Sequence, residues 1–300
     1  PDGVINVVTG GPQTGAALCA HPDIHYIDLT GGTTTGRKVA AVAGERLVQT
    51  TMELGGKTPV LVCQDADLDG AIAGGLFSAF VASGQTCVSG ARFIVHHDIY
   101  DAFVTGIAAR ADAITLGDPM ADTTQIGPVI SKTSQDRCKR MIATAKADGA
   151  VQVAGASDPN LPAPFDQGFY IRPTVFKDVR PEQELFLEEV FGPVVSVTPF
   201  DTEEEALALA NTGTFGLGVS IWSRDIARAH RLSLGIRGGV IWLNDHHRND
   251  PRSVWGGVRD SGFGKENGWD ALKAYMTKKS VIVRTAPGHD DWFAGSNRYG

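Results

Sequence analysis

The sequence is poor in cysteine, with four cysteines among 300 residues. They lie far apart, and no C-x-x-C pair or short-spaced Cys/His set is present. Neither a structural zinc site nor a disulfide framework is therefore expected. So few cysteines in a chain of this length are typical of a reducing compartment, and we expect the protein to be cytoplasmic.

Excess positive charge and long apolar runs are also lacking. The formal net charge is −7, so no strongly basic surface favours nucleic acid as a partner. No uncharged apolar run approaches the roughly 18 residues that a membrane-spanning helix needs. The histidine pair His246–His247 is a weak metal candidate, because adjacent residues of a strand point to opposite faces. We expect no metal, and we place this pair at the substrate mouth instead.

Glycine, in contrast, is abundant, with 36 residues dispersed along the chain. Residues 24–29 alternate like a strand, residues 30–36 form a glycine-containing turn, and residues 37–46 resemble a helix. A strand, a glycine turn and a helix in this order present backbone N–H groups to phosphate. Turns of this kind serve α/β packing as often, so both interpretations stay open here.

Cys87 stands apart from the other cysteines because it lies in a loop. Apolar residues recur every four positions in residues 65–83, which predicts a helix ending at Ser83–Gly84. Cys87 follows directly and precedes a strand predicted over residues 92–95. Loops on rigid elements often carry chemistry. The local sequence fits a nucleophile and a structural cysteine about equally well.

The second half of the chain alternates between strand and helix patterns. Strands are predicted over residues 194–199, 217–222 and 240–243, and helices over residues 202–211 and 224–234. The first of these helices opens with a capping-box pattern. This alternation predicts an α/β fold with a mostly parallel sheet and helices on its faces.

Glu53 begins the segment Glu53-Leu54-Gly55-Gly56-Lys57, which places a carboxylate at a double-glycine turn. A strand and a helix separate this turn from Cys87, and an excursion of that kind can bring both ends to one sheet edge. A cysteine nucleophile needs a base or a lowered pKa, and a carboxylate can also activate water. The alternative for Glu53 is a solvated surface turn.

These two segments, with others in the same order, carry a resemblance to a known family. The E-L-G-G-K segment and Gly84-Gln85-Thr86-Cys87 resemble the two signature motifs of the NAD(P)-dependent aldehyde dehydrogenase superfamily. The similarity extends over about residues 1–284. It also includes the following segments: residues 1–10, Thr30–Thr33, Glu188–Pro193, Asn244, Gly256–Gly257 and Ser261–Gly268.

The resemblance implies a role for each matching residue. Cys87 would attack the aldehyde, and its backbone N–H would supply part of an oxyanion hole. Glu53 would activate the water that hydrolyses the thioester. The cofactor would be NAD, with NADP possible, and the substrate a small-molecule aldehyde. The residues implied for cofactor binding are Gly31 and Gly32 under the pyrophosphate, Leu54 through its backbone at the nicotinamide, Glu189 at the ribose, and Phe191 beside it.

The resemblance also implies a domain organisation. Residues 1–55 would be the C-terminal part of a parallel-sheet dinucleotide-binding domain, and residues 56–260 an α/β catalytic domain. Residues 261–300 would be a C-terminal segment with an oligomerisation strand near Val281–Val283. That strand would pair with a neighbouring subunit, so we expect a homodimer or a homotetramer.

Departures from the family pattern leave two alternatives. Gly32 stands where the family often has serine, so only its backbone can meet phosphate. Because the chain begins at Pro1 and the family has a further N-terminal segment, we expect the C-terminal portion of a longer protein. One alternative is a coenzyme A-acylating relative, which Glu53 argues against. The other is a non-catalytic truncated or assembly protein. Trp242 and Trp255 would suit an aromatic or quaternary-ammonium aldehyde, or would be core residues.

Overall fold

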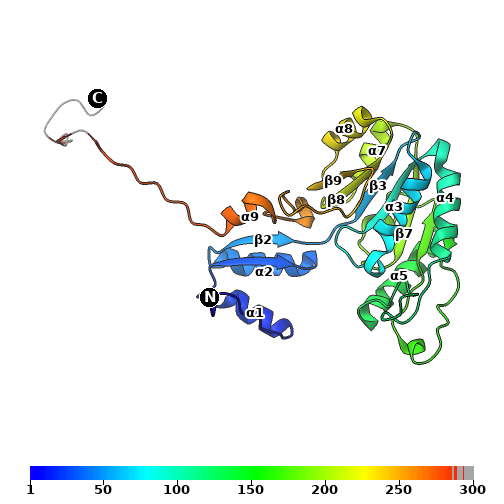
Figure 1. Ribbon diagram of the computed structural model, residues 1–300, viewed down its shortest axis with the longest axis horizontal. Helices are drawn as coiled ribbons and strands as arrows, with labels where there is room; N and C mark the ends of the chain where they lie inside the picture. Colours follow the sequence, from blue (N-terminus) through cyan, green and yellow to red (C-terminus); the bar gives the residue numbers. More distant parts are fainter. Residues whose placement is uncertain (286, 289–292, 294–300) are drawn as a thin grey trace.

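The computed structural model describes residues 1–285, 287, 288 and 293, and these residues form two β-sheets. Figure 1 shows the smaller sheet with α1, α2 and α9 on one side of the molecule and the larger sheet with its helices on the other. The elements in chain order are α1 (Pro12–Ala20), β1 (Tyr26–Thr30), α2 (Thr33–Glu45), β2 (Gln49–Glu53), β3 (Thr58–Val62), α3 (Leu68–Phe80), η1 (Val81–Gly84), β4 (Gly90–His96), α4 (His97–Asp112), α5 (Lys132–Ala147), β5 (Val151–Ala154), η2 (Phe165–Gln167), β6 (Thr174–Lys177), α6 (Glu184–Leu187), β7 (Val194–Phe200), α7 (Glu203–Ala210), β8 (Gly218–Trp222), α8 (Ile226–Gly235), β9 (Val240–Leu243), η3 (Arg259–Ser261), β10 (Gly262–Phe263) and α9 (Gly268–Ala274).

The larger sheet has seven strands in the order β5-β6-β7-β4-β3-β8-β9. Every neighbouring pair is parallel except β5 with β6. The predicted α/β class is confirmed, and the predicted strands and helices of the second half are all present. Thr202 Oγ1 accepts a hydrogen bond from Glu205 N, as the capping-box pattern predicts.

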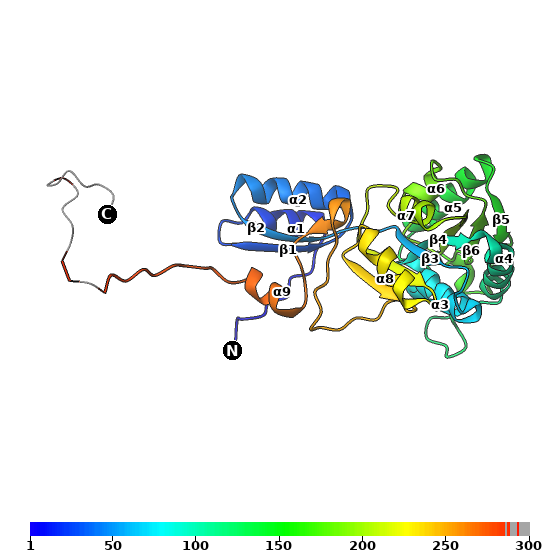
Figure 2. The ribbon, with the colours of Figure 1, turned by 90° about the horizontal axis from the view of Figure 1, so that it is seen from above.

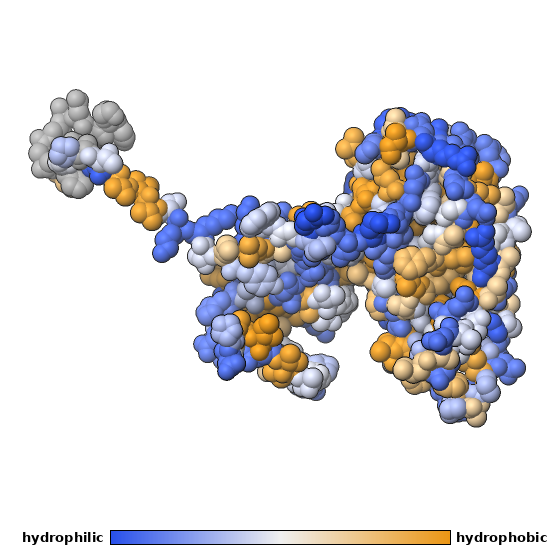
Figure 3. Space-filling model, in the orientation of Figure 1, coloured by the Kyte–Doolittle hydropathy of each residue, from blue (hydrophilic) through white to orange (hydrophobic). Residues whose placement is uncertain are grey.

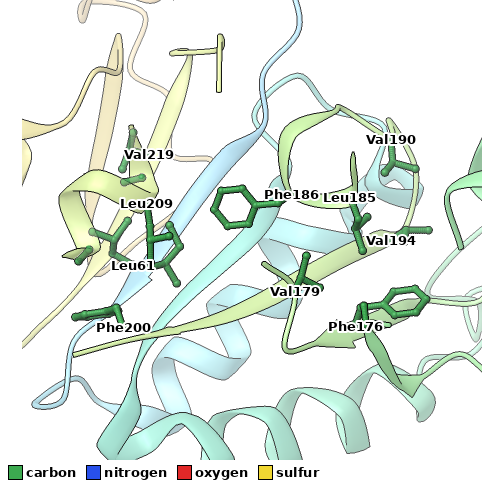
Figure 4. Packing of buried hydrophobic residues seen from close by; sticks show 14 of the residues in the cluster. Leu61, Phe176, Val179, Leu185, Phe186, Val190, Val194, Phe200, Leu209 and Val219 are labelled. Atoms are coloured by element: carbon green, nitrogen blue, oxygen red, sulfur yellow. The ribbon is translucent and has the colours of Figure 1, made fainter. Parts of the chain in front are cut away.

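The seven-stranded sheet is covered on both faces, so its central strands are largely buried and mostly apolar. Successive side chains of β3 alternate between two buried clusters: Val60 and Val62 pack with α3 and α4, whereas Leu61 packs with α5, α6, α7 and α8. Figure 2 shows helices on both sides of these strands. In Figure 4, Leu61 lies close to Leu209, among the side chains of the cluster formed with α5, α6, α7 and α8. Burial of each large apolar side chain contributes about 1.5–3 kcal/mol.

The smaller sheet has three strands in the order β1-β2-β10. β1 runs parallel to β2, and β10 runs antiparallel to it, with Thr30 and Gly262 both paired to Glu53. Glu53 is therefore the last residue of the middle strand. The next strand, β3, belongs to the other sheet, so the segment from Leu54 to Lys57 connects the two sheets.

Two helix boundaries differ from the sequence prediction. α3 ends at Phe80 because Ala82, Ser83 and Gly84 have φ values of 50°, 57° and 68°, which a right-handed α-helix cannot include. α2 begins at Thr33 and includes Gly36, which was expected in the turn. A Cβ on Gly36 would lie 2.5 Å from Leu54 Cδ2, so this glycine permits close packing of α2 on the connecting segment.

The C-terminal segment leaves the body of the protein as an extended chain (Figures 1 and 2). Val281, Ile282 and Val283 are exposed and belong to no strand of the described residues. The rest of the segment predicted over 261–300 includes residues 286, 289–292 and 294–300, which lie outside the described residues. Among the helices within residues 1–285, none is both long and apolar enough to cross a membrane.

Candidate active site

Glu53 lies at the end of β2 with its carboxylate in the protein interior. Its side chain is 4% exposed, and a Cβ on Gly256 would lie 2.5 Å from Oε1. Within the described residues, no hydrogen bond of ordinary geometry reaches either carboxylate oxygen, although the side chain of Trp255 lies near enough to favour the charged form and lower the pKa. A buried carboxylate without partners is costly for folding, which makes this residue a candidate for chemistry rather than stability.

The environment of Glu53 raises its pKa from 4.5 to about 7. Burial is the largest cause, and the negative charge of Glu266 adds to it, while Lys265 opposes the shift. A carboxylate with this pKa exists in both protonation states near neutral pH. It can therefore take a proton from a thiol or from water and release it again.

Cys87 lies in a turn directly beside the connecting segment. A Cβ on Gly56 would lie 2.4 Å from the carbonyl oxygen of Cys87, so only glycine permits this approach of the two backbones. The structure thus brings the E-L-G-G-K segment and the Cys87 loop together, as the strand–helix excursion between them predicts.

The pKa of the Cys87 thiol is raised to about 11. Burial is the main cause, and the charges of Glu53 and Glu189 add to it, whereas the backbone N–H groups of Cys87 and Val88 lower the pKa. The thiol is therefore protonated at neutral pH and needs a base to become a nucleophile. Its two backbone donors are the type of group that stabilises an oxyanion.

Glu189 supports the double-glycine turn through its carboxylate. Its Oε1 accepts a hydrogen bond from Gly56 N at 2.8 Å, and a Cβ on Gly55 would lie 2.7 Å from its Oε2. Burial raises the pKa of Glu189 to about 7. Phe191, Glu189, Gly56 and Thr86 line one small cavity of about 10 Å³, so Glu189 and Phe191 lie next to the Cys87 turn.

Gly31 and Gly32 form the turn between β1 and α2, as predicted. Gly31 N donates to the carbonyl oxygen of Glu53 at 3.0 Å, which ties this turn to the candidate base. Gly32 is the N-cap of α2, and a Cβ there would meet no atom within 4 Å. The N-terminus of α2 is thus open to a ligand at this glycine.

Two residues of the C-terminal motif have roles that the sequence did not reveal. Ser261, fully buried, donates from Oγ to Gly55 O at 2.6 Å and accepts from Gly216 N at 2.9 Å. Lys265 Nζ donates to the carbonyl oxygens of Gly256 and Gly257 at 2.7 and 2.9 Å. The motif therefore holds the connecting segment and the backbone beside Glu53 in place.

Lys57, the last residue of the E-L-G-G-K segment, was also overlooked. It is 2% exposed, and its Nζ has no hydrogen-bond partner in the part of the chain that the structure describes. Burial, with the positive charge of Arg92, lowers its pKa to about 7. Arg92 is itself buried and donates from Nε to Lys57 O at 2.9 Å. The only sequence signal for this pair was the position of Lys57 in the motif.

Trp242 and Trp255 lie beside the Cys87 turn, with ring centroids 6.1 Å apart. Trp242 is buried and packs with Val88 and Leu217, and Trp255 is half-buried against that cluster. His246 was expected at a substrate mouth, but the structure places it in the interior at 4% exposure. No three His, Cys, Asp or Glu side chains of the described residues are grouped so that they could hold a metal ion.

Comparison with known proteins identifies the family. The model of the aldehyde dehydrogenase family matches residues 1–281. The chain belongs to this family. A betaine aldehyde dehydrogenase of Sinorhizobium fredii is 43% identical over 283 residues, which are 94% of this chain and 58% of that protein. One of Rhizobium leguminosarum is 42% identical over 96% of this chain and 58% of its own length.

Solved aldehyde dehydrogenases have the same fold. The betaine aldehyde dehydrogenase of Staphylococcus aureus, in complex with NAD+, gives a TM-score of 0.90 at 33% identity, over 94% of this chain and 55% of that one. The NAD+ complex of an aldehyde dehydrogenase from Bacillus cereus gives 0.88 at 36% identity, over 92% and 55% of the two chains. The chain thus spans little more than half the length of the family members that it matches.

The residues of this aldehyde dehydrogenase chain fit a dinucleotide cofactor. Gly32 leaves open space at the N-terminus of α2, which suits a pyrophosphate. Leu54 N is already engaged, because it donates to Ser261 O at 3.1 Å, so its carbonyl oxygen is the backbone group that can meet a nicotinamide. One carboxylate oxygen of Glu189 accepts a hydrogen bond from Gly56 N, and the other can accept one from a ribose hydroxyl.

Proposed function

We propose that this chain carries the catalytic residues of an NAD+-dependent enzyme that oxidises an aldehyde to a carboxylic acid. The proposal rests on one observation above the others. Glu53 is a buried carboxylate with no ordinary hydrogen bond from the residues that the structure describes, and it directly precedes the short segment of residues 54–57, against which the Cys87 turn lies. Family membership supports the reaction class.

The proposed reaction begins at the Cys87 thiol. Glu53 removes its proton, Sγ bonds to the aldehyde carbon, and the backbone N–H groups of Cys87 and Val88 stabilise the oxyanion of the thiohemiacetal. When bound, NAD+ supplies the hydride acceptor. Hydride loss leaves a thioester on Cys87. Glu53 releases the proton of the thiol to solvent and then takes a proton from water, whose oxygen bonds to the acyl carbon. The C–S bond breaks, and the proton that Glu53 took from water passes to the departing Cys87 thiolate.

We assign five residues to the cofactor. Gly31 and Gly32 face the pyrophosphate through their backbone, and Leu54 meets the nicotinamide. Glu189 binds the nicotinamide ribose, and Phe191 packs beside it. NAD+ is favoured over NADP+ because two solved relatives contain NAD+.

The proposed substrate is a small-molecule aldehyde. The curated relatives named above are betaine aldehyde dehydrogenases, whose names indicate a quaternary-ammonium aldehyde. The half-buried Trp255 offers an aromatic face of the kind that attracts such cations. Betaine aldehyde is therefore the first substrate to test.

The domain division and the assembly are also proposals. We assign residues 1–55 to the cofactor domain, residues 56–260 to the catalytic domain and residues 261–300 to the C-terminal segment. The exposed Val281–Val283 stretch would pair with another subunit in a homodimer or homotetramer. Sedimentation equilibrium of the purified protein measures that mass, and a monomer would refute the pairing.

The direct test measures NADH formation by the protein that carries this chain, with betaine aldehyde, propanal and benzaldehyde as substrates. Wild type should form NADH with at least one of them, and Cys87→Ala should lose at least about a thousandfold of the rate. Cys63→Ala, which changes a buried cysteine after β3, is the matched control and should keep the rate. A Cys87→Ala variant with near wild-type activity would overturn the proposal.

Stimulation by coenzyme A, with an acyl-CoA product, would show that a thiol replaces water as acceptor.

A further inference from the structure

His246 and His247 contact the Cys87 turn on both of its sides. His247 Nε2 lies 3.1 Å from Thr86 Oγ1, and His246 Nε2 lies 2.8 Å from the carbonyl oxygen of Val88. The two residues that flank the nucleophile are thus each bonded to one member of an adjacent histidine pair. This pair comes from the loop after β9, more than 150 residues further along the chain.

The turn itself determines where the thiol and the oxyanion donors point. Ser89 N donates to Thr86 O at 3.0 Å, so Cys87 and Val88 are the two central residues of a β-turn. The backbone N–H groups of both residues favour the charged form of the Cys87 thiol and lower its pKa. A rotation of this turn would move the nucleophile and its donors together.

The hydrogen bond of His246 has only one possible direction. A carbonyl oxygen accepts, so Nε2 of His246 carries the proton and donates to Val88 O. Nδ1 then holds the lone pair, and it is buried without a partner among the described residues. Burial lowers the pKa of His246 to about 4, so the ring is a neutral donor at any pH near neutrality.

The loop that carries the histidines is anchored to the seven-stranded sheet. Asn244 exchanges two hydrogen bonds with the backbone of Ser223, both at 2.9 Å, and Ser220 Oγ donates to Asp245 O at 2.6 Å. The His246 ring also packs on Trp242, with centroids 4.8 Å apart. The loop is therefore held in a fixed position on β8 and β9, and the histidine pair links the Cys87 turn to it.

We propose that His246 and His247 are positioning residues that hold the turn of Thr86, Cys87 and Val88 in its reactive orientation, with the N–H of His246 on Val88 O as the principal contact. The proposal rests on the proposed role of Cys87 as the nucleophile. A metal role does not compete with it, because His246 Nε2 is engaged with a backbone carbonyl. In this proposal the two histidines act through the turn.

The test distinguishes the contribution of the His246 N–H group from the contribution of its aromatic ring. His246→Phe keeps an aromatic ring against Trp242 but leaves the Val88 carbonyl unpaired, whereas His246→Gln keeps an N–H group close to the place of Nε2. The measured quantity is the rate at which iodoacetamide alkylates Cys87, followed by mass spectrometry of its peptide without aldehyde or cofactor. His246→Phe should slow this rate, and kcat where turnover is measurable, by about tenfold, since an unpaired buried carbonyl destabilises the native turn.

The other variants make the result decisive. His246→Gln should stay within about threefold of wild type, and so should His230→Phe, a change of an exposed histidine on α8. Equal losses in His246→Phe and His246→Gln, or wild-type alkylation in His246→Phe, would overturn the proposal. If His246→Phe does not fold, Thr86→Val tests the His247 side, and an unchanged alkylation rate there would overturn it. Because alkylation needs no turnover, a protein without dehydrogenase activity would refute the proposed function and still test the positioning role.

Discussion

The two sheets of this protein differ in how completely the chain covers them. In the seven-stranded sheet, every residue of β3 and β8 is buried, and helices pack on both faces. In the smaller part, α1 has no buried residue, and β1 has a single one, Ile27. Figure 3 shows orange apolar side chains on the surface of the smaller part, below its hydrophilic upper edge.

The two halves of the candidate site rest on different sheets. Cys87, Glu189 and the histidine pair rest on the seven-stranded sheet, and their positions are determined by its buried core. Glu53 and the glycine turn at Gly31 belong to the smaller sheet. The segment of residues 54–57 joins the halves, and Ser261 and Glu189 hold it from two sides.

The largest expected effect comes from one identical substitution made in both parts. Leu61→Ala in β3 removes a fully buried side chain and should lower the free energy of unfolding by about 3–5 kcal/mol. Leu18→Ala in α1 changes a side chain that is 45% exposed and should change it by less than about 0.5 kcal/mol. Urea denaturation of both variants measures the difference. Similar losses would show that the smaller part is packed as tightly as the larger one.

A smaller effect is expected at the junction of the two parts, and it depends on pH. The pKa of Glu53 is about 7 in the folded protein and about 4.5 ordinarily, so folding favours its protonated form. The stability that this proton provides is complete below pH 4.5 and is lost as the pH rises through 7. Glu53→Gln should therefore be more stable than wild type at pH 8, by roughly 3 kcal/mol, and equal to it near pH 4.

Denaturation at both pH values checks this prediction, with the exposed Glu204→Gln on α7 as the matched control. A Glu53→Gln variant that is less stable than wild type at pH 8 would show that the carboxylate has native partners. Glu53 would then be a structural residue, and the contrast between a packed core and a strained junction would fail.

The sequence allowed most of the fold to be predicted, because its signals are local. Leu68, Ile72 and Phe80 recur at helical spacing, and Thr202 with Glu205 forms the predicted cap. The same locality explains the two helix boundaries that were wrong. The limits of α2 and α3 depend on Leu54 across a tertiary contact and on positive φ values, neither of which periodicity reports.

The main residues of the candidate site were predictable from the sequence, but the contacts that hold them in place were not. Cys87 and Glu53 emerged from their loop settings and from the family resemblance. The bond from Ser261 to Gly55 joins residues 206 positions apart, and the burial of His246 follows from the path of a long loop. Spacing does not report such contacts, nor the burial that raises the pKa of Glu53.

The most direct test of the central claim locates the acyl group. Glu53→Gln protein is mixed with NAD+ and the best aldehyde of the panel, quenched in acid at times from seconds to minutes, and digested for mass spectrometry. We predict an acyl adduct on the peptide that contains Cys87. It should form more slowly than in wild type but persist longer, because the substitution slows thioester hydrolysis more than acylation. Cys87→Ser should show no thioester. An adduct on Cys19, Cys63 or Cys138, or NADH formation at the wild-type rate without any adduct, would contradict the account.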